Sequence, residues 1–405
     1  MSSTKSLCIY LHVHQPYRVR HYTIFDAGSN HNYFETPYEE RTSNERVIHK
    51  VMEKSYIPMN ITLMDMLLKH PEFKVSLSIT GTVLEQFERF APQVLDSFKS
   101  LVSTGRVEIL AETYHHSLAF FYSRAEFERQ VEMHADKIEK VFGVTPTAFR
   151  NTELSYNNEV GKWADEAGYK AVLAEGWDPV MGWRSPNYVY KPINTEHIKL
   201  LTKNYRLSDD IAFRFGNKEW KDHPLTTEKF VHWINESDPH AKTFNLFMDY
   251  ETFGEHQWAD TGIFEFMKAL PSEWLKYSDH TFMTVSETAQ HHHAVDELDV
   301  PNTTTWADTE RDLSAWLGNS MQTSAIHALY EMEEDVINSN DLALIDDWRK
   351  LQTSDHFYYM CTKWFNDGDI HAYFSPYESP YEAYLNFMNS WHDLRFRLHQ
   401  KGLGV

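Results

Sequence analysis

The 405-residue chain contains little of what would indicate a secreted, membrane-spanning or nucleic-acid-binding protein. It has only two cysteines, Cys8 and Cys361, which excludes a disulfide framework and indicates a reducing, cytoplasmic compartment. No apolar run approaches the roughly 18 residues of a membrane span, and we expect no signal peptide before the first strand-like segment. There is no Lys/Arg run, and 38 basic against 59 acidic residues give a net charge of −21, which disfavours nucleic acid and anionic membranes as partners.

Aromatic residues are abundant, at 15% of the chain, with 12 Trp, 22 Tyr and 25 Phe. Many of them stand beside polar residues rather than inside apolar runs. Aromatic rings present flat apolar faces, and Trp and Tyr add a polar group, so they suit half-wet surfaces. Sugars combine apolar C–H faces with hydroxyl rims and would match such surfaces. A large aromatic core would explain the same composition.

Strand-like and helix-like segments alternate over the first three quarters of the chain. Two of the helices carry clear end signals, since Pro92 begins one and Gly143 ends another. Repeated βα units predict a parallel sheet, and seven or eight of them in about 290 residues favour a closed barrel over an open sheet. The strand-like segments are 7–14, 74–80, 106–111, 147–151, 169–174, 197–203, 243–249 and 281–285.

The pattern changes near residue 301, where strand signals fade and helical spacing dominates. Helices are expected at 314–336, 342–351 and 380–399. We therefore predict a catalytic barrel over 1–300 and a helical C-terminal domain over 301–405. Residues 17–60 carry few strand signals and are expected to form an excursion after the first strand.

Carboxylates follow most of the predicted strands. In a βα barrel the active site forms where the strands end, so these side chains should converge. Acids also favour the helix N-termini that follow strands, which could explain one or two positions but not the whole set. Cleavage of a glycosidic bond needs two carboxyl groups, one as proton donor and one as nucleophile or base. The acids in question are Glu85, Glu112, Glu153, Glu175, Asp249, Glu251 and Glu287.

Two histidines close the first strand. His12 and His14 are two residues apart, so their side chains face the same side of the strand. Such a pair can bind a metal or hydrogen-bond substrate hydroxyls. No cysteine or third histidine stands at ligand spacing, although His115 and His116 are available, so we favour substrate contact and predict no metal or other cofactor.

Five motifs in order carry a family resemblance. The chain resembles glycoside hydrolase family 57, and within it the α-amylase group. The absence of GxGxxG, GxxxxGK[ST], CxxC and GxSxG motifs leaves nucleotide, zinc-finger and serine-hydrolase functions unsupported. The motifs are HVHQPY at 12–17, GTVLEQF at 81–87, FRNTELSYN at 149–157, MDYETFGEHQW at 248–258 and LQTSDHFYYM at 351–360.

The resemblance implies an α/β fold, a distorted TIM-like (β/α)7 barrel followed by a C-terminal helical bundle that completes the cleft. It also implies a retaining mechanism on α-1,4-glucans. By motif position, Glu153 matches the nucleophile and Asp249 the general acid/base. The positions that match the substrate-binding subsite are His12, His14, Glu85, Glu251 and Asp355.

Two further stretches and one tryptophan lie outside the family motifs. In 305–322, Trp316 is either a glucose-stacking platform or a tryptophan buried between domains. Trp177 is a candidate for the cleft wall. In 208–215, Asp209 and Asp210 are expected on a turn, with Arg214 as a pairing partner.

We therefore predict a retaining α-amylase that hydrolyses internal α-1,4 bonds of starch- or glycogen-like glucans, with an α-glucan as its partner. A 4-α-glucanotransferase or branching enzyme would use the same carboxylates. A non-catalytic glucan-binding protein and a metal-dependent deacetylase are the remaining alternatives. The sequence leaves the oligomeric state open.

Overall fold

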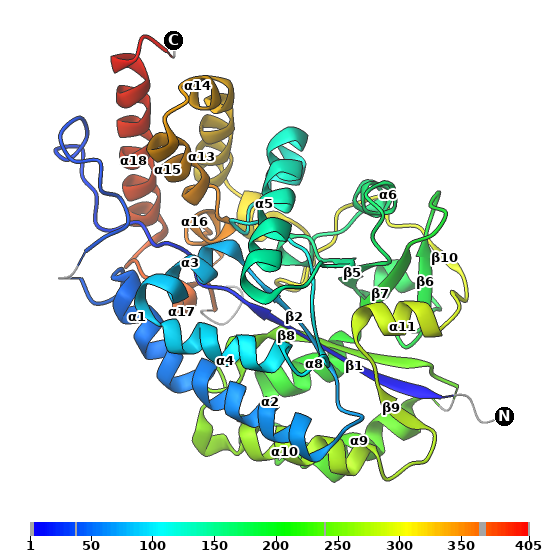
Figure 1. Cartoon of the computed structure of the whole chain (residues 1–405). Helices are drawn as coiled ribbons and strands as arrows, with labels where there is room; N and C mark the ends of the chain where they lie inside the picture. The colour runs from blue at the N-terminus through cyan, green and yellow to red at the C-terminus, as the bar shows by residue number, and fades with distance from the viewer. Residues whose placement is uncertain (1–3, 37–38, 239, 364–369, 404–405) are drawn as a thin grey trace.

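The computed structural model describes residues 4–36, 39–238, 240–363 and 370–403. Its strands form two five-stranded sheets flanked by helices (Figure 1). The first sheet holds β1 (Lys5–Val13), β2 (Val75–Ile79), β3 (Val107–Ile109), β8 (Thr243–Asp249) and β9 (His280–Phe282). The second holds β4 (Ala148–Phe149), β5 (Ala171–Glu175), β6 (Val189–Pro192), β7 (Lys199–Lys203) and β10 (Glu297–Leu298).

Parallel pairing brings the carboxyl ends of the strands to one edge. In the first sheet β1 pairs in parallel with β2, β8 and β9, and its register sets His12 opposite Asp249. In the second sheet, the one antiparallel pair among the described strands is β6 with β7. All eight predicted strands are confirmed, whereas the short β6 and β10 were not predicted.

Hydrogen bonds join the two sheets at two places. The backbone N–H of Ala111 donates to Ala148 O, and that of Arg150 donates to Ala111 O, both at 2.9 Å. On the other side the N–H of Asn204, after β7, donates to Asn245 O of β8 at 2.9 Å. The two sheets are therefore hydrogen-bonded to each other at two places, after β3 and after β7.

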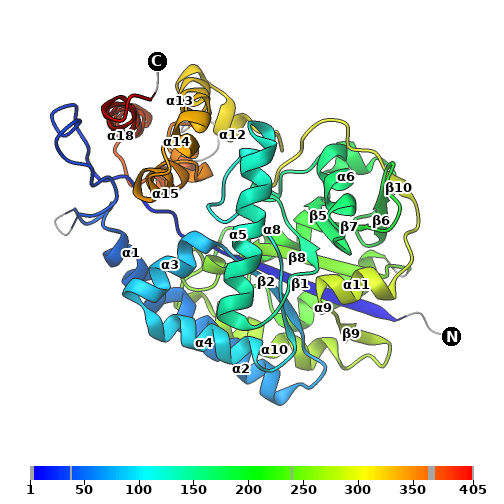
Figure 2. The same cartoon turned by 45° about the horizontal axis from the view of Figure 1, so that its top comes forward.

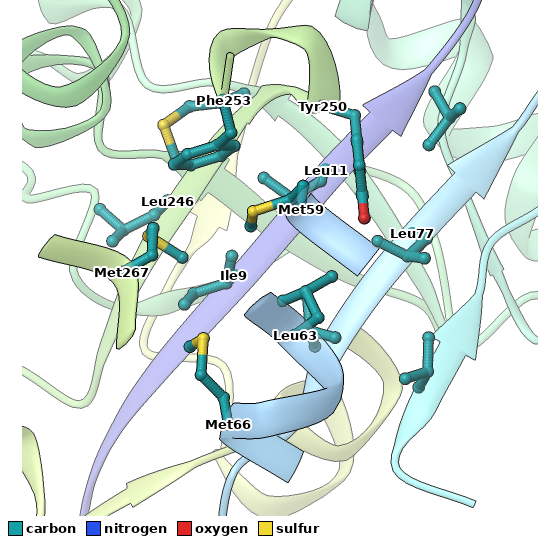
Figure 3. Packing of buried hydrophobic residues seen from close by; sticks show 14 of the residues in the cluster. Ile9, Leu11, Met59, Leu63, Met66, Leu77, Leu246, Tyr250, Phe253 and Met267 are labelled. Carbon is teal, nitrogen blue, oxygen red and sulfur yellow. The ribbon is translucent and has the colours of Figure 1, made fainter. Parts of the chain in front are cut away.

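A large apolar core surrounds β1. The strand is buried on both faces, as expected for a parallel strand that helices cover. Ile9 and Leu11 lie against Met59 and Leu63 of α2 (Figure 3). The helices before residue 300 are α1 (Asn44–Val51), α2 (Ile57–Lys69), α3 (Gly81–Phe90), α4 (Pro92–Val102), α5 (Arg124–Phe142), α6 (Asn158–Glu166), α7 (Asp178–Met181), α8 (Tyr205–Asp209), α9 (Thr227–Ser237), α10 (Ile263–Trp274) and α11 (Val285–His291).

The described residues after 300 form helices and loops. They share a second core with α5 and with the excursion. The loop of the excursion lies beside the C-terminal helix in both views (Figures 1 and 2), and Tyr22 N–H of this loop donates to Asn386 Oδ1 at 3.1 Å. The prediction of one helix over 314–336 is wrong in detail, because the structure has three shorter helices in this region. The first ends at Leu317, Asn319 caps the second, and the third begins at Glu333. The helices are α12 (Ser314–Leu317), α13 (Ser320–Glu331), α14 (Glu333–Asn338), α15 (Leu342–Lys350), α16 (Ser354–Tyr358), α17 (Ile370–Phe374) and α18 (Pro380–Gln400).

The excursion is largely helical at its end, where α1 runs through a π-helical turn, Met52–Tyr56, into α2. The domain boundary at residue 300 stays a prediction. Over the described part of the chain, no helix is both long enough and apolar enough to traverse a bilayer.

Candidate active site

A cleft of about 850 Å³ opens at the carboxyl ends of β1 and β8. Side chains from both halves of the chain line it. Seven of the nine predicted site residues are among them, and they are His12, His14, Glu153, Asp249, Glu251, Trp316 and Asp355.

Glu85 and Trp177 lie outside the lining of this cleft. Glu85 is half-buried on α3 and accepts a hydrogen bond from the Tyr114 hydroxyl at 2.7 Å. Trp177 directly precedes α7. A role for these two side chains in substrate binding stays a prediction.

Glu153 sits in a 3₁₀ turn, Thr152–Leu154, with a left-handed backbone at φ 58°. Three donors hold its carboxylate: His116 Nε2 at 3.0 Å and Ser354 Oγ at 2.9 Å from Oε1, and Trp306 Nε1 at 3.0 Å from Oε2. Burial raises the pKa of Glu153, but the charges of His116 and Arg150 outweigh burial and keep this pKa below its usual value. Glu153 is therefore an ionised carboxylate in a fixed orientation, as a nucleophile requires.

Asp249 ends β8 and faces the same cleft. Its Oδ1 lies 3.7 Å from His12 Nδ1, and its side chain is 43% exposed. Burial raises the pKa of Asp249, but the hydrogen bond and charge of His12 outweigh it, so the pKa is lowered. In the chain without substrate Asp249 is ionised.

Glu112 connects the two carboxylates. It is fully buried, and its Oε2 lies 3.1 Å from His12 Nε2 and 3.6 Å from both His116 Nδ1 and Arg150 Nη1. His12 also contacts Asp249, and His116 also contacts Glu153. A chain of charged and hydrogen-bonding groups therefore runs from Asp249 through Glu112 to Glu153.

His116 and His14, which line the cleft with their ring centroids 4.2 Å apart, differ in charge. Burial lowers the pKa of His116, but Glu153 and Glu112 outweigh it and raise the pKa to about 9. Burial, reinforced by the charge of His116, lowers the pKa of His14 to about 4. At neutral pH His116 is a cation beside Glu153, while His14 is neutral and hydrogen-bonds Asp355 Oδ2 at 3.0 Å.

Glu251, two residues after Asp249, is the protonated carboxyl of the site. It accepts a short hydrogen bond from the Tyr56 hydroxyl. Burial and the neighbouring charge of Asp249 raise the pKa of Glu251 to about 8. The two carboxyls thus hold one proton at neutral pH, as expected for crowded like charges.

The C-terminal helices complete the site through α16. Ser354 N–H donates to His116 O at 2.8 Å, and Thr353 forms a bridge with Ser117. These backbone contacts deliver the Ser354 hydroxyl to Glu153 and the Asp355 carboxylate to His14. Ser354 and Trp306 were not predicted, although Ser354 lies in the fifth family motif and Trp306 in the 305–322 stretch, because nothing in their local sequence indicates a contact with Glu153.

Trp316 lines the cleft with only 1% of its surface exposed, and its ring lies 6.0 Å from that of Tyr358. Its Nε1 has no hydrogen-bond partner among the described residues. A buried tryptophan describes this side chain better than a glucose-stacking platform that is open to the cleft. Its indole N–H is still available to donate a hydrogen bond.

Among the residues that the structure describes, two side-chain groups have ligand atoms close enough for a metal ion. They are His12, Glu112 and His116, and His14, His116 and Asp355. Both need His116, which is protonated at neutral pH and lies 3.4 Å from the Arg150 guanidinium. A divalent ion in either group would have to displace a proton from His116 and would lie near the fixed positive charge of Arg150, which disfavours metal binding there.

Comparison with known proteins identifies the family. The model of glycosyl hydrolase family 57 matches residues 8–301. A Methanocaldococcus jannaschii protein named "putative alpha-amylase" is 42% identical over 395 residues, which are 95% of this chain and 83% of the relative. A 4-alpha-glucanotransferase of Thermococcus litoralis is 27% identical over 51% of this chain, but only 30% of its own length is covered.

Solved structures agree on the fold. A family 57 branching enzyme of Thermococcus kodakaraensis superposes with a TM-score of 0.71 at 13% identity, covering 99% of this chain and 92% of the other. An α-amylase of Thermotoga maritima gives a TM-score of 0.63 at 14% identity, covering 98% and 93%. Given the family match and the close relative, this chain is a glycoside hydrolase that belongs to glycosyl hydrolase family 57.

Proposed function

We propose that the enzyme cleaves internal α-1,4 bonds of starch- or glycogen-like glucans and maltooligosaccharides with net retention. The observation that carries this proposal is the pair Glu153 and Asp249 on one cleft, one carboxylate fixed by three donors and the other half exposed. Names of the family 57 relatives support an α-glucan as substrate.

In the proposed reaction Glu153 attacks the anomeric carbon while Asp249 protonates the departing glycosidic oxygen. The glycosyl–Glu153 ester then reacts with water, from which Asp249 takes a proton. A glucan would cover the exposed part of Asp249 and raise its pKa, and Glu251 holds a proton two residues away. His12, His14 and Asp355 would bind the attacked glucose.

We further propose that seven strands, β1, β2, β3, β4, β5, β7 and β8, form the distorted barrel of the fold. The hydrogen bonds of Ala111 and Asn204 between the two sheets support this arrangement. It would explain why side chains from residues 12 to 249 reach one cleft.

Glucan transfer is the second candidate function, because the cleft also carries exposed rings that suit an acceptor sugar. Phe213, Trp258 and Tyr373 line it at 60%, 61% and 60% exposure. Incubation with maltoheptaose separates the two, since hydrolysis increases reducing ends and transfer leaves their number constant.

The variant Glu153→Gln tests the nucleophile. We expect kcat on soluble starch to fall by about 10⁴-fold or more, because the ester can no longer form. Glu159→Gln is the matched control, since that glutamate is 77% exposed on α6 and should leave kcat unchanged. Full activity of the Glu153 variant would refute the assignment.

A further inference from the structure

Four side chains from stretches outside the family motifs meet beside the cleft. Arg311 Nη1 lies 3.3 Å from Glu175 Oε2, and its Nη2 lies 3.3 Å from Asp209 Oδ2. Lys203 Nζ contacts the same two carboxylates, at 3.6 and 3.2 Å. Arg214, the expected partner of Asp209 and Asp210, pairs with Asp210 as predicted, whereas Asp209 pairs with Lys203 and Arg311. Two cations and two anions thus form a nearly buried, balanced cluster.

Such a cluster contributes little net stability, because desolvation of the charges offsets their attraction. The cluster does, however, fix the positions of the side chains that form it. Besides its two carboxylate partners, Arg311 donates a short hydrogen bond to the backbone oxygen of Trp306. Thr305 N–H donates to Arg311 O at 2.9 Å and closes the loop 305–311. The guanidinium therefore holds the backbone of Trp306 from inside its own loop.

Trp306 in turn contacts Glu153 twice. Its backbone N–H donates to Glu153 O at 3.3 Å, and its indole N–H donates to Glu153 Oε2 at 3.0 Å. The indole ring also lies between two cations, with the Arg150 guanidinium 5.0 Å and Lys203 Nζ 5.7 Å from its centroid. A shift of the loop would change both contacts to the carboxylate at once.

We propose that Arg311, anchored by Glu175 and Asp209, is a positioning residue that fixes Trp306 against Glu153. The inference rests on the proposed role of Glu153 as nucleophile. Loss of the anchor would leave the cleft intact but free one of the three donors of the carboxylate, so chemistry should slow while sugar binding persists.

The kinetic test uses Arg311→Met and Glu175→Gln, with Arg214→Met as the matched control because Arg214 is an ion-paired arginine whose partner is Asp210. We expect kcat on maltoheptaose to fall about 10- to 100-fold with KM within about twofold. The acid limb of kcat should also move to higher pH, because Glu153 loses a donor that favours its ionised form. The control should match wild type. An increase in KM at unchanged kcat would overturn the inference and assign Arg311 to direct sugar binding.

A second readout does not depend on turnover. In ¹⁵N-tryptophan-labelled enzyme, the Trp306 indole N–H resonance, assigned with Trp306→Phe, should lie downfield and move upfield in both anchor variants. An unmoved resonance would overturn the inference even if activity falls. If wild type shows no glucan turnover, the proposed function fails and this resonance alone decides the positioning. If Arg311→Met does not fold, Glu175→Gln, which removes only the charge, decides between the two outcomes.

Discussion

At the residue scale, the buried Glu112 links the two sides of the site without lining the cleft. His12 and His116 contact it from either side. Burial raises the pKa of Glu112, but the charge of His12, the hydrogen bonds of both histidines and the charge of Arg150 outweigh it and hold this pKa well below its usual value. Glu153 and the hydrogen bond to Glu112 keep His116 protonated, and His116 and Arg150 keep Glu153 ionised. The ionised state of Glu153 therefore depends on His116, on Arg150 and, through His116, on Glu112.

The alkaline side of the activity profile should depend on Glu251. Its pKa of about 8 means that the pair with Asp249 loses its shared proton above that pH. We expect kcat/KM to fall about tenfold per pH unit above roughly pH 8, since no proton remains for the leaving oxygen. Glu251→Gln should remove the limb near pH 8 and shift the loss of activity to lower pH, because Asp249, whose pKa is lowered, is then the only carboxyl of the pair. A limb that stays near pH 8 in the variant would exclude Glu251 as the titrating group.

Stability should depend on pH through His116. Its folded-state pKa of about 9 lies above the ordinary 6.5, so its contribution is fully present below pH 6.5 and is lost as the pH rises through 9. At roughly 1.4 kcal/mol per unit, the difference in unfolding free energy between wild type and His116→Gln should shrink by about 3 kcal/mol from pH 6 to pH 10. Urea denaturation measures it. His21→Gln, at a 60% exposed histidine, should show no such change.

A single site residue can be predicted from the sequence when its local position indicates its role, and not when its role depends on contacts with distant residues. Glu153 and Asp249 follow strands, and their position alone indicated a shared cleft. Asp355 came only from the family resemblance, because a helical Asp-His pair is common. Ser354 and Trp306 depend on neighbours more than 150 residues away, with Ser354 201 residues and Trp306 153 residues from Glu153. No local pattern encodes such contacts.

At the element scale, strands that alternate with helices were predictable even when short, as β3, β4 and β9 are. β1 and β8 are mostly apolar and buried, and His12 and Asp249 lie at or next to their carboxyl ends. β6 was missed because no helix separates it from its antiparallel neighbour β7, and β10 has only two residues. The break between α12 and α13 has a local cause, since Asn319 forms a capping box with Gln322.

The turn after Glu251 is an element that the site requires. Gly254 has φ 107°, and a Cβ there would lie 1.8 Å from the backbone oxygen of Lys54 in the π-helical turn that carries Tyr56. Gly254→Ala should therefore destabilise the fold by about 3 kcal/mol or more and separate Tyr56 from Glu251. Gly262→Ala is the control, because that glycine has φ 84° but nothing within 4 Å, and should cost only about 1 kcal/mol. Equal thermal shifts of the two variants would contradict this prediction.

At the scale of the whole molecule, the described residues after 300 pack against the rest of the chain. Their apolar side chains share one core with α5 and the excursion. Arg349 of α15 reaches Glu126 of α5 with two hydrogen bonds, at 2.8 and 3.0 Å, and Gln130 of the same helix donates to Gln352 at 2.8 Å. This buried polar contact lies directly before Thr353 and the site residues of α16.

Arg349→Met should therefore affect both stability and activity. It leaves the buried Glu126 without its cation, which typically costs about 3–5 kcal/mol, and loosens the approach to Ser354. Denaturant unfolding and kcat measure the two effects. Arg129→Met, at a 56% exposed arginine on α5, should leave both unchanged. A loss of stability without any change in kcat would show that α15 does not position α16.

The dependence of Glu153 on Ser354 has a consequence for biosynthesis. The ribosome must polymerise the segment beyond residue 353 before the nucleophile acquires its full set of donors. A polypeptide that ends before this segment would lack the Ser354 donor, so its turnover in the proposed reaction should be reduced, and the appearance of full activity would report that translation had passed this point and that the C-terminal segment had docked.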